Sequence, residues 1–542
     1  MTKKEKTAEL LKSTHEQNDL MKPTTICILT SGIGSRLGDY TKIKNKSLLS
    51  LNKEAILSKI INNFPKNSKF IISIGYKSQQ VKDFIKIHHP KLNVKFINIK
   101  NFSGKKSGPA FSLYKCKSFL QTPFFFVSCD TIWKKKISNY KSYNWMGSFN
   151  SKKIKKKNYC NLISINRNVK KIIDKKKIKN SLNTSIFVGL AFIKDYKIFW
   201  DGFGFSKLGE PQVSMGFKNL LKKNKIIKKI DIDWEDTGTK QNYEDLILKY
   251  EKYNFNKENQ QIYISDSKVT KFFDNKNTIK KLYKKAIKKR KVFPENISIK
   301  NNFISYNYVK GRTLYNSFSK ENFKNLLVYL EKNLWNNKIL KNQKFLNNCR
   351  IFYYNKTHDR INLFLKKNNY LEKKEIIYKG KKLHKIRYIL KIINWNQIFD
   401  GLPNFIHGDL QFDNILFKPK KNFKLIDWRP SFGNNNIIGD QYYDFAKLLG
   451  CFEINYDLVK KNKFKFKINK KKLSLQIPKR NNSKNLIEYF QSYLCKRNID
   501  FKKVRIITGL IFLNMSPLHH HPFDKLLYLY GKYYLQKYLN LK

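Results

Sequence analysis

The segment from Phe405 to Trp428 constrains the fold of this chain more than any other stretch, because it spaces three polar residues along an apolar strand–loop–strand pattern, FIHGDLQFDNILFKPKKNFKLIDW. Asp409 follows a short apolar run, Asn414 comes five residues later, and Asp427 ends the next apolar run. Phosphoryl transfer requires a carboxylate that accepts the proton of the attacking hydroxyl, and oxygen ligands that hold Mg²⁺ on the phosphates. A carboxylate on a loop, an amide after it and a second carboxylate ending the next hairpin supply that set.

The motif HGDLQFDNIL followed by LIDW resembles the catalytic loop of the aminoglycoside phosphotransferase and choline kinase superfamily, which reads HGD where protein kinases read HRD. The resemblance implies a bilobal α+β kinase-like fold that uses ATP. It also implies that Asp409 is the catalytic base and that Asn414 and Asp427 bind magnesium. His407 is expected to brace the loop through hydrogen bonds, although the motif alone is equally consistent with a direct part in the reaction.

The formal net charge of +72 would by itself indicate a nucleic-acid or anionic-membrane partner. The lysines, however, are spread along the whole chain and come with abundant Asn, Ile, Phe and Tyr, which is typical of AT-rich coding. The sequence contains no homeodomain, zinc-finger, RRM or KH signature. We therefore expect a solvated basic surface and no specific nucleic-acid partner.

The length of 542 residues is enough for two or three domains, each with a sizeable core. No apolar run has the length of a membrane span, and the first residues lack the apolar core of a signal peptide. The seven cysteines are scattered, without a C-x-x-C pair. These features predict a cytoplasmic protein with no integral membrane segment, no disulfide framework and no zinc site.

The N-terminal half begins with a short β-branched strand, Thr24–Thr30, that runs into the glycine-rich loop SGIGSRLG. Glycines let backbone N–H groups approach phosphate oxygens, and Arg36 adds a forked cation. The spacing is neither G-x-G-x-x-G nor that of a Walker A loop. Lys46 follows ten residues after Arg36 and precedes an apolar run.

A strand, G-x-G-x-R-L and a later lysine resemble the sugar-phosphate and phosphocholine nucleotidylyltransferases, which have a Rossmann-like α/β fold. The chain departs from their fingerprint at Thr30 and Ser31, and it has Asn45 where proline is usual. The resemblance assigns catalysis to Arg36 and Lys46. It assigns nucleotide binding to Gly32, Gly34, Ser35 and Gly108, the last in a second glycine element, SGPA.

Two further features fall in the order of that family. The strand Phe124–Val127 leads to Asp130, and the segment IDIDWEDTGT contains Asp236. The resemblance makes these two carboxylates the magnesium ligands. Two carboxylates can fix Mg²⁺ on the α-phosphate of an NTP and on an attacking phosphomonoester. Arg36 and main-chain amides would then hold the pyrophosphate, and Lys46 would neutralise charge near the α-phosphorus.

The expected domain organisation is a polar tail (1–22), a nucleotidyltransferase domain (23–253), a linker (254–261) and a kinase-like domain (262–542). Within the last, the hairpin around Lys271 resembles the strands whose lysine contacts the ATP phosphates. The helix predicted at 277–291 lacks the acid that usually pairs with that lysine, which leaves Glu295 or another arrangement. The segment 303–314 is predicted to be a strand pair that turns at Gly311.

Past the metal loop, Asp444, with Asp440 as second choice, is expected to brace the catalytic loop. The aromatic residues Trp428, Tyr442 and Tyr443 are candidates for the acceptor pocket, where an ammonium group could bind by cation–π contact. Each of these rings could equally belong to the core. The cluster His519–His521 is expected to shape a loop, because three consecutive histidines cannot all face one metal.

Together these features predict a bifunctional transferase. One half would phosphorylate a small alcohol, choline or ethanolamine first, with ATP and Mg²⁺. The other would couple the phosphomonoester to CTP or UTP, giving an activated donor for surface polysaccharide or lipid. A sugar kinase with a nucleotide-sugar pyrophosphorylase is the alternative within the enzyme class. A non-catalytic basic protein that binds RNA or membranes is the alternative outside it.

Overall fold

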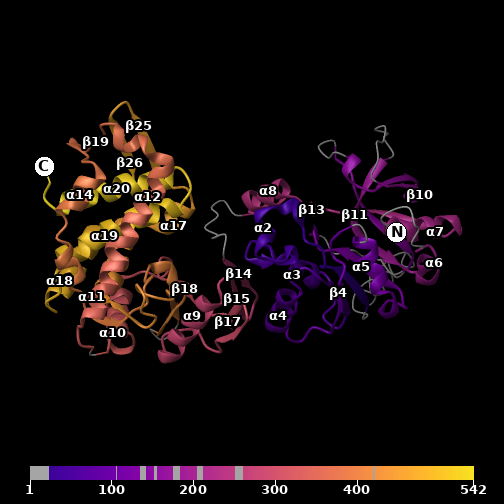
Figure 1. Cartoon of the computed structure of the whole chain (residues 1–542), viewed down its shortest axis with the longest axis horizontal. Coiled ribbons are helices and arrows are strands. Elements are labelled where there is room, and N and C mark those ends of the chain that lie inside the picture. The colour runs from indigo at the N-terminus through magenta and orange to yellow at the C-terminus, as the bar shows by residue number, and fades with distance from the viewer. Residues whose placement is uncertain are drawn as a thin grey trace, which may run out of the picture. The chain divides into compact units, whose positions relative to one another are not determined.

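The computed structural model describes residues 24–104, 107–134, 142–151, 156–174, 184–203, 212–250, 260–337, 339–418 and 422–541. The chain divides into two compact units (Figure 1). The first comprises Met1–Asp274 and Lys300–Phe303, and the second comprises Asn275–Ile299 and Ile304–Lys542. The predicted tail and most of the predicted linker lie outside the described residues.

The first unit is built on a mixed nine-stranded sheet. Its strands lie in the order β5 (Val94–Asn98), β4 (Lys69–Ile74), β1 (Thr25–Leu29), β6 (Phe124–Ser128), β11 (Thr184–Ile193), β8 (Asn144–Phe149), β12 (Ile227–Asp231), β10 (Asn168–Ile173) and β9 (Asn161–Ile165). β1 pairs in parallel with β4 on one side and with β6 on the other. β11 runs antiparallel to β6.

Helices cover both faces of this sheet, which explains why β1 is a continuous apolar run. Ile26 and Ile28 point into a core shared with α3 (Ile56–Asn62), α4 (Ser78–His88) and α8 (Lys240–Tyr250). Cys27 and Leu29 point into a second core. The helices of that second core are α5 (Pro109–Lys115), α6 (Tyr196–Asp201) and α7 (Ser214–Lys222). Strands buried on both faces lose the apolar–polar alternation of a half-exposed sheet.

From β1 the chain adds β4 and then β5 on one side of the sheet, and it later adds β6 on the other side of β1. The order in which strands are added therefore reverses between β1 and β6, although these two strands are parallel. In open α/β sheets the loops after such neighbouring parallel strands leave a crevice at their carboxyl ends. The glycine-rich loop follows β1, and Asp130 follows β6. A small antiparallel pair, β7 (Thr131–Trp133) and β13 (Trp234–Asp236), lies directly after Asp130.

The antiparallel hairpin of β14 (Gln260–Ile264) and β15 (Lys268–Phe273) groups with the first unit. The Tyr263 hydroxyl donates to the carbonyl of Leu48 at 2.6 Å, and Thr270 Oγ1 lies 3.0 Å from His88 Nδ1. Lys271 is buried on β15. The hairpin that the sequence attributes to the second domain thus contacts the first unit in this structure.

The second unit is mainly helical. Its first part contains α9 (Lys276–Lys288), β16 (Ser298–Lys300), β17 (Phe303–Asn307), β18 (Arg312–Thr313), α10 (Lys320–Asn333), α11 (Gln343–Cys349), the π-helical turn η5 (Arg350–Asn355), α12 (Lys356–Asn368), α14 (Ile386–Ile392) and α15 (Trp395–Phe399). Its second part contains β21 (Pro403–Phe405), β22 (Ile415–Lys418), β23 (Asn422–Leu425), β24 (Ile438–Asp440), α16 (Gln441–Glu453), α17 (Tyr456–Lys460), α18 (Ser483–Cys495), α19 (Phe501–Met515) and α20 (Phe523–Tyr538).

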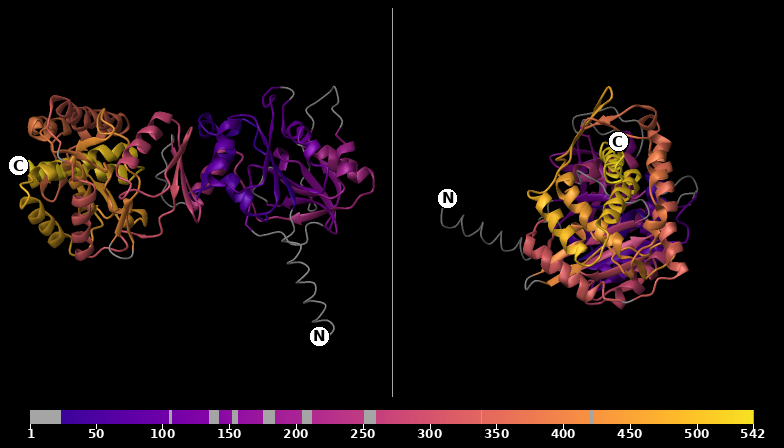
Figure 2. Two further views of the ribbon diagram at one scale, coloured as in Figure 1. Left: turned by 90° about the horizontal axis from the view of Figure 1, so that it is seen from below. Right: turned by 90° about the vertical axis from the view of Figure 1, so that its left-hand side faces the viewer.

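The helix α19 forms the centre of the second unit and packs against α16 and α20 (Figures 1 and 2). All but one residue of α16 are buried, so its polar side chains face other protein groups. None of the described helices is both long and apolar enough to span a bilayer.

The strand pair predicted at 303–314 is wrong in its pairing. β18 pairs with β22, with Arg312 opposite Phe417. A Cβ atom on Gly311 would lie 2.8 Å from the Phe417 carbonyl oxygen, so this glycine permits a close approach to β22 and does not close a hairpin.

Candidate active sites

The first site forms where the segments after β1, β6 and β13 meet. In the β7–β13 pair Asp236 lies opposite Thr131, which brings it beside Asp130 although the two are far apart in sequence. The main-chain N–H of Thr237 donates to the Asp130 carbonyl at 3.0 Å. A Cβ atom on Gly238 would lie 3.0 Å from an Asp236 carboxylate oxygen and 3.2 Å from one of Asp130. The two carboxylates therefore converge on this glycine.

Two predicted cations lie at the same place. Lys46 Nζ is 3.2 Å from Asp130 Oδ2, and an Arg36 guanidinium nitrogen would lie 3.5 Å from the Gly238 Cβ position. Burial opposes the charge on Asp130, but Lys46 and Arg36 outweigh it and lower the pKa of that carboxyl. Asp130 is thus ionised at neutral pH and can bind a cation.

Asp236 is held by three donors: the N–H of Gly238 at 2.8 Å, the Tyr159 hydroxyl at 2.8 Å and the Asn242 amide at 2.7 Å. Burial and the neighbouring charge of Asp130 raise its pKa. Two neighbouring carboxylates repel each other when both are ionised, and a cation bound between them removes that repulsion. Because the metal ligands that they offer are oxygens, they fit a hard divalent ion such as Mg²⁺.

Asn45, the departure from the expected proline, ties the lysine loop to the glycine-rich loop. Its side-chain amide donates to the carbonyls of Thr30 at 3.0 Å and Tyr76 at 2.7 Å, and its carbonyl oxygen accepts from Ser47. A proline could make none of these side-chain bonds. Asn45 therefore holds this turn in place through side-chain hydrogen bonds.

The glycine-rich loop leaves backbone accessible. Gly34 adopts a left-handed conformation with φ of 73°, and a Cβ there would lie 3.2 Å from the Lys46 side chain. A Cβ on Gly32 would meet no atom within 4 Å. Ser35 is exposed at the start of the 3₁₀ turn η1 (Ser35–Leu37), and Gly108 precedes α5 with φ of 139°.

Substitution of Gly238 by Ala is expected to lower pyrophosphate release about tenfold, because the added methyl group must push the Asp130 and Asp236 oxygens apart by a few tenths of an ångström. Steady-state kinetics with the NTP and phosphomonoester selected by the screen described under the proposed function provide the measurement. Gly450→Ala is the matched control, since its Cβ would meet only ordinary contacts at 3.7 Å and beyond. Equal rates in the two variants would contradict the convergence of the two carboxylates in the working site.

The second site is the loop between β21 and β22. Asp444 on α16 accepts hydrogen bonds from the N–H groups of His407 and Gly408, both at 2.8 Å, and from the Trp335 indole at 3.1 Å. Burial raises the pKa of Asp444 to about 6. His407 bonds through Nε2 to the Ile426 carbonyl at 2.9 Å and accepts from the Asp409 N–H through Nδ1. These bonds fix the loop around Asp409.

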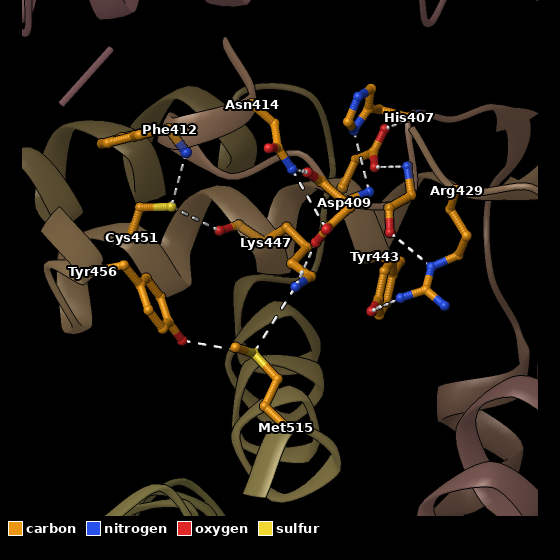
Figure 3. A network of polar contacts seen from close by, with 12 residues as sticks. His407, Asp409, Phe412, Asn414, Arg429, Tyr443, Lys447, Cys451, Tyr456 and Met515 are labelled. Carbon is orange, nitrogen blue, oxygen red and sulfur yellow. Dashed lines mark hydrogen bonds and ion pairs between the residues drawn. The ribbon is translucent and has the colours of Figure 1, made fainter. Parts of the chain in front are cut away.

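Asp409 forms an ion pair with Lys447 of α16, with 2.7 Å between Oδ1 and Nζ (Figure 3). Burial opposes ionisation of Asp409, but Lys447 and Arg429 lower its pKa to about 2. The Arg429 guanidinium donates to the Gly408 carbonyl at 3.0 Å and lies 3.5 Å from the Tyr443 hydroxyl. The carboxylate is therefore ionised and held in place.

The two predicted metal ligands lie beside this loop. Asn414 donates from its side chain to the Asp409 carbonyl at 2.9 Å and is 3.4 Å from Asp409 Oδ2. The main-chain carbonyl of Asn414 accepts a hydrogen bond from the N–H of Ile426, the residue before Asp427. Asp427 has a left-handed backbone with φ of 59°, a conformation that L-residues seldom adopt and that recurs at functional sites. Amide and carboxylate oxygens from these positions fit Mg²⁺.

The helix α9 contacts the loop around Asp409 through a buried lysine. Lys285 Nζ donates to the Arg429 carbonyl at 3.1 Å and lies 3.5 Å from that of His407. Burial lowers the pKa of Lys285 to about 7. Glu295, the substitute partner that the sequence offered for Lys271, lies 3.6 Å from Lys424.

The three predicted aromatic residues lie in different surroundings. Trp428 is buried, donates to the Leu282 carbonyl and packs 4.6 Å from the Phe293 ring. Tyr442 is buried beside Lys503, whereas Tyr443 lies next to Arg429.

Asp440 caps α16, and His521 lies 3.7 Å from Asp524. No cluster of three or more His, Cys, Asp or Glu suited to a metal occurs in the part of the chain that the structure describes.

Sequence reasoning missed Lys447, Tyr159 and Asn242. A signal existed for Lys447, because it lies three residues after Asp444 and hence on the same face of α16. Asn242 follows the Asp236 segment at the start of α8, where side chains point back toward the preceding loop. Nothing near Tyr159 in the sequence indicates its role.

Comparison with protein-family models and with curated proteins finds no match. Among solved structures, the N-terminal part is similar to the inositol-1-phosphate CTP transferase of T. maritima, at 16% identity and a TM-score of 0.34, over 42% of this chain and 96% of that one. It is similar to the CTP:phosphocholine cytidylyltransferase of Streptococcus pneumoniae, at 17% identity and 0.34, over 42% and 99%. A UDP-glucose pyrophosphorylase from Acinetobacter baumanii matches at 12% and 0.35, over 42% and 93%.

Proposed function

We propose that the chain is a bifunctional transferase. The second unit transfers the γ-phosphoryl group of ATP to a hydroxyl of a small acceptor. The first unit joins the resulting phosphomonoester to the nucleoside monophosphate of an NTP, with CTP as first choice and UTP as second. The product would be an activated donor for polysaccharide or lipid synthesis.

The observation that carries the nucleotidyl-transfer half is the convergence of Asp130 and Asp236 on Gly238, with Lys46 and Arg36 beside them. In this reaction a phosphate oxygen of the monoester attacks the α-phosphorus of the NTP, and pyrophosphate leaves. Mg²⁺ bound by Asp130 and Asp236 would supply charge neutralisation on the reacting phosphates. Lys46 and Arg36 would add fixed positive charge where negative charge develops, and N–H groups of the glycine-rich loop would bind the leaving pyrophosphate.

The phosphoryl-transfer half is supported by the ionised, immobilised carboxylate of Asp409 between Asn414 and Lys447. The acceptor hydroxyl attacks the γ-phosphorus, Asp409 takes its proton, and ADP leaves. Mg²⁺ on Asn414 and Asp427 would neutralise the phosphates. Lys447 would stabilise both the carboxylate and the transferred group, since its ammonium is buried and pairs with Asp409.

The proposal is tested with the purified chain, Mg²⁺ and ATP by following ADP release over a panel of amino alcohols, polyols, hexoses and their acids. Phosphomonoesters of the same compounds are then tested with each of four NTPs by following pyrophosphate release. We expect one acceptor whose hydroxyl form gives ADP and whose phosphorylated form gives pyrophosphate. Absence of pyrophosphate with every pair would contradict the role of the first unit, and absence of ADP would contradict that of the second.

A further inference from the structure

Three cationic side chains act on the candidate base Asp409 in the described part of the chain, and a fourth, Arg360, lies near two of them. Lys356 and Arg360 lie one turn apart on α12, Arg429 lies in the loop after β23, and Lys447 lies on α16. The last two have partners in the site, since Lys447 pairs with Asp409 and Arg429 bonds to the loop carbonyl before it. The carboxylate of Asp409 thus interacts with cations from three separate segments, namely Lys356, Arg429 and Lys447.

The two cations of α12 form no close ion pair in the part of the chain that the structure describes, although Asp409 acts on Lys356 and the exposed Asp359 acts on Arg360 from farther away. Within the described residues, neither Lys356 nor Arg360 has a carboxylate at ion-pair distance, although both side chains are half-buried. Lys356 Nζ lies 3.8 Å from the centre of the Phe352 ring, on the π-helical turn η5, and 5.8 Å from that of Tyr443. Burial and the neighbouring cations lower the pKa of Lys356 well below its usual value. Cations crowded in this way are costly unless an anion binds among them.

The position of this cluster places it on the acceptor side of Asp409. Figure 3 shows Asn414 and Tyr443 on opposite sides of the Asp409 carboxylate. Asn414 is one of the proposed magnesium ligands, so it marks the side of Asp409 on which the ATP phosphates would bind. Tyr443, on the other side, borders Lys356 and Arg429. Because the attacking and leaving oxygens lie in line across the transferred phosphorus, the acceptor must approach from the side away from the nucleotide.

From this arrangement we infer that the acceptor carries an anionic group, a carboxylate or a phosphate, in addition to its reacting hydroxyl, and that Lys356 and Arg360 bind that group. The inference rests on the proposed phosphoryl transfer. Arginine presents a fork that matches both kinds of anion, and lysine adds a point charge. An ammonium-bearing acceptor such as choline, which the aromatic residues of the sequence favoured, would be repelled by the same cations.

A charge series of acceptors provides the first test. ADP release is measured with glycerol, glycerate and glycerol 3-phosphate, with glucose, gluconate and glucose 6-phosphate, and with choline and ethanolamine. We expect at least one anionic member to exceed its neutral counterpart in kcat/KM by about 10- to 100-fold, as charged hydrogen bonds provide. The acid and phosphate members of each series distinguish a carboxylate from a phosphate as the recognised group.

Variants of α12 provide the second test. Arg360→Gln and Lys356→Met are expected to raise the KM for the anionic acceptor about tenfold and to leave the KM for ATP within about twofold. Arg360→Lys should recover part of the loss, because it restores the charge. Lys367→Gln, an exposed lysine on the same helix, is the matched control and should behave as the unchanged chain. Thermal unfolding of each variant checks that the fold is retained.

Three results would overturn the inference. A rise in the KM for ATP in place of that for the acceptor would assign the cluster to the triphosphate. Efficient phosphorylation of choline or a neutral polyol, unaffected by Arg360→Gln, would show that the acceptor needs no anion while leaving the proposed function intact. Failure of every acceptor to give ADP release that depends on Asp409 would contradict the kinase reaction itself, and the inference with it.

Discussion

Replacing Asp409 with Asn is expected to lower ADP release by about 10²–10⁴-fold, the usual contribution of a positioned general base. The amide cannot accept the proton of the attacking hydroxyl, although it can retain the contact with Asn414. Pyrophosphate release from a supplied phosphomonoester and NTP should be unchanged, because the residues assigned to that reaction belong to the first unit. Parallel assays of the two products on one protein preparation make the comparison.

The same substitution removes the counterion of a buried lysine. Lys447 would keep its charge without the carboxylate now 2.7 Å away, and breaking such a pair costs about 3–5 kcal/mol. The double variant Asp409→Asn/Lys447→Met should recover the free energy of unfolding, measured in urea, but not ADP release. This separates loss of the base from loss of the fold. Substantial ADP release by the single variant would contradict the assignment of Asp409 as the base.

The pKa of Asp409 gives a related expectation for pH. Its value of about 2 lies below the usual carboxyl value, so the native state favours the ionised form. A carboxyl group whose pKa is lowered by folding stabilises the native state at pH values above its unfolded-state pKa of about 4. This stabilisation is lost as the pH falls toward about 2. Titration of Asp409 should therefore not appear in the rate profile of ADP release between about pH 5 and 8.

Replacing Asp130 with Asn is expected to lower pyrophosphate release by about 10²–10³-fold, equivalent to about 3–4 kcal/mol of lost transition-state stabilisation. The substitution removes the carboxylate that Lys46 and Arg36 keep ionised. It should also abolish the rise in melting temperature that Mg²⁺ with NTP produces in the unchanged chain, since a ligand stabilises only a protein that binds it. ADP release should be unaffected.

Asp233→Asn is the matched control for this prediction, because Asp233 is an exposed carboxylate in the segment that also carries Asp236. Chelation of Mg²⁺ with EDTA should reproduce the loss of pyrophosphate release and of the thermal shift in the unchanged chain, and should add nothing to these two losses in the variant. An Asp130→Asn protein that retains both its pyrophosphate rate and its Mg²⁺-dependent thermal shift would show that Asp130 does not bind the metal.

The parts of the fold and sites that sequence could predict are those with local signals. The apolar runs at β1 and β6 are buried on both faces, so their strand character is evident without the structure. Asp130 lies just after the end of β6, and Asp409 lies in the loop between β21 and β22, which made both carboxylates candidates. Asp444, which the sequence also singled out, accepts hydrogen bonds from the N–H groups of His407 and Gly408.

What sequence could not predict depends on contacts between distant segments. β18 pairs with β22 across a hundred residues, and no local pattern distinguishes this from a hairpin with β17. The Tyr159 hydroxyl reaches Asp236 from the loop before β9, far away in the sequence. Lys356 was hidden among a very large number of lysines, most of them expected to be solvated, and only its place beside Asp409 separates it from them.

The central claim, that one chain makes a phosphomonoester and then consumes it, is tested most directly by following the γ-phosphate of ATP. The protein is incubated with ATP labelled at the γ-phosphate, Mg²⁺, unlabelled CTP or UTP and the acceptor that the charge series identifies. We predict that the label appears first in the phosphomonoester and then in a nucleoside-diphosphate-linked product, and that the pyrophosphate stays unlabelled. Label confined to the phosphomonoester, or a linked product that carries none, would contradict the sequential reaction.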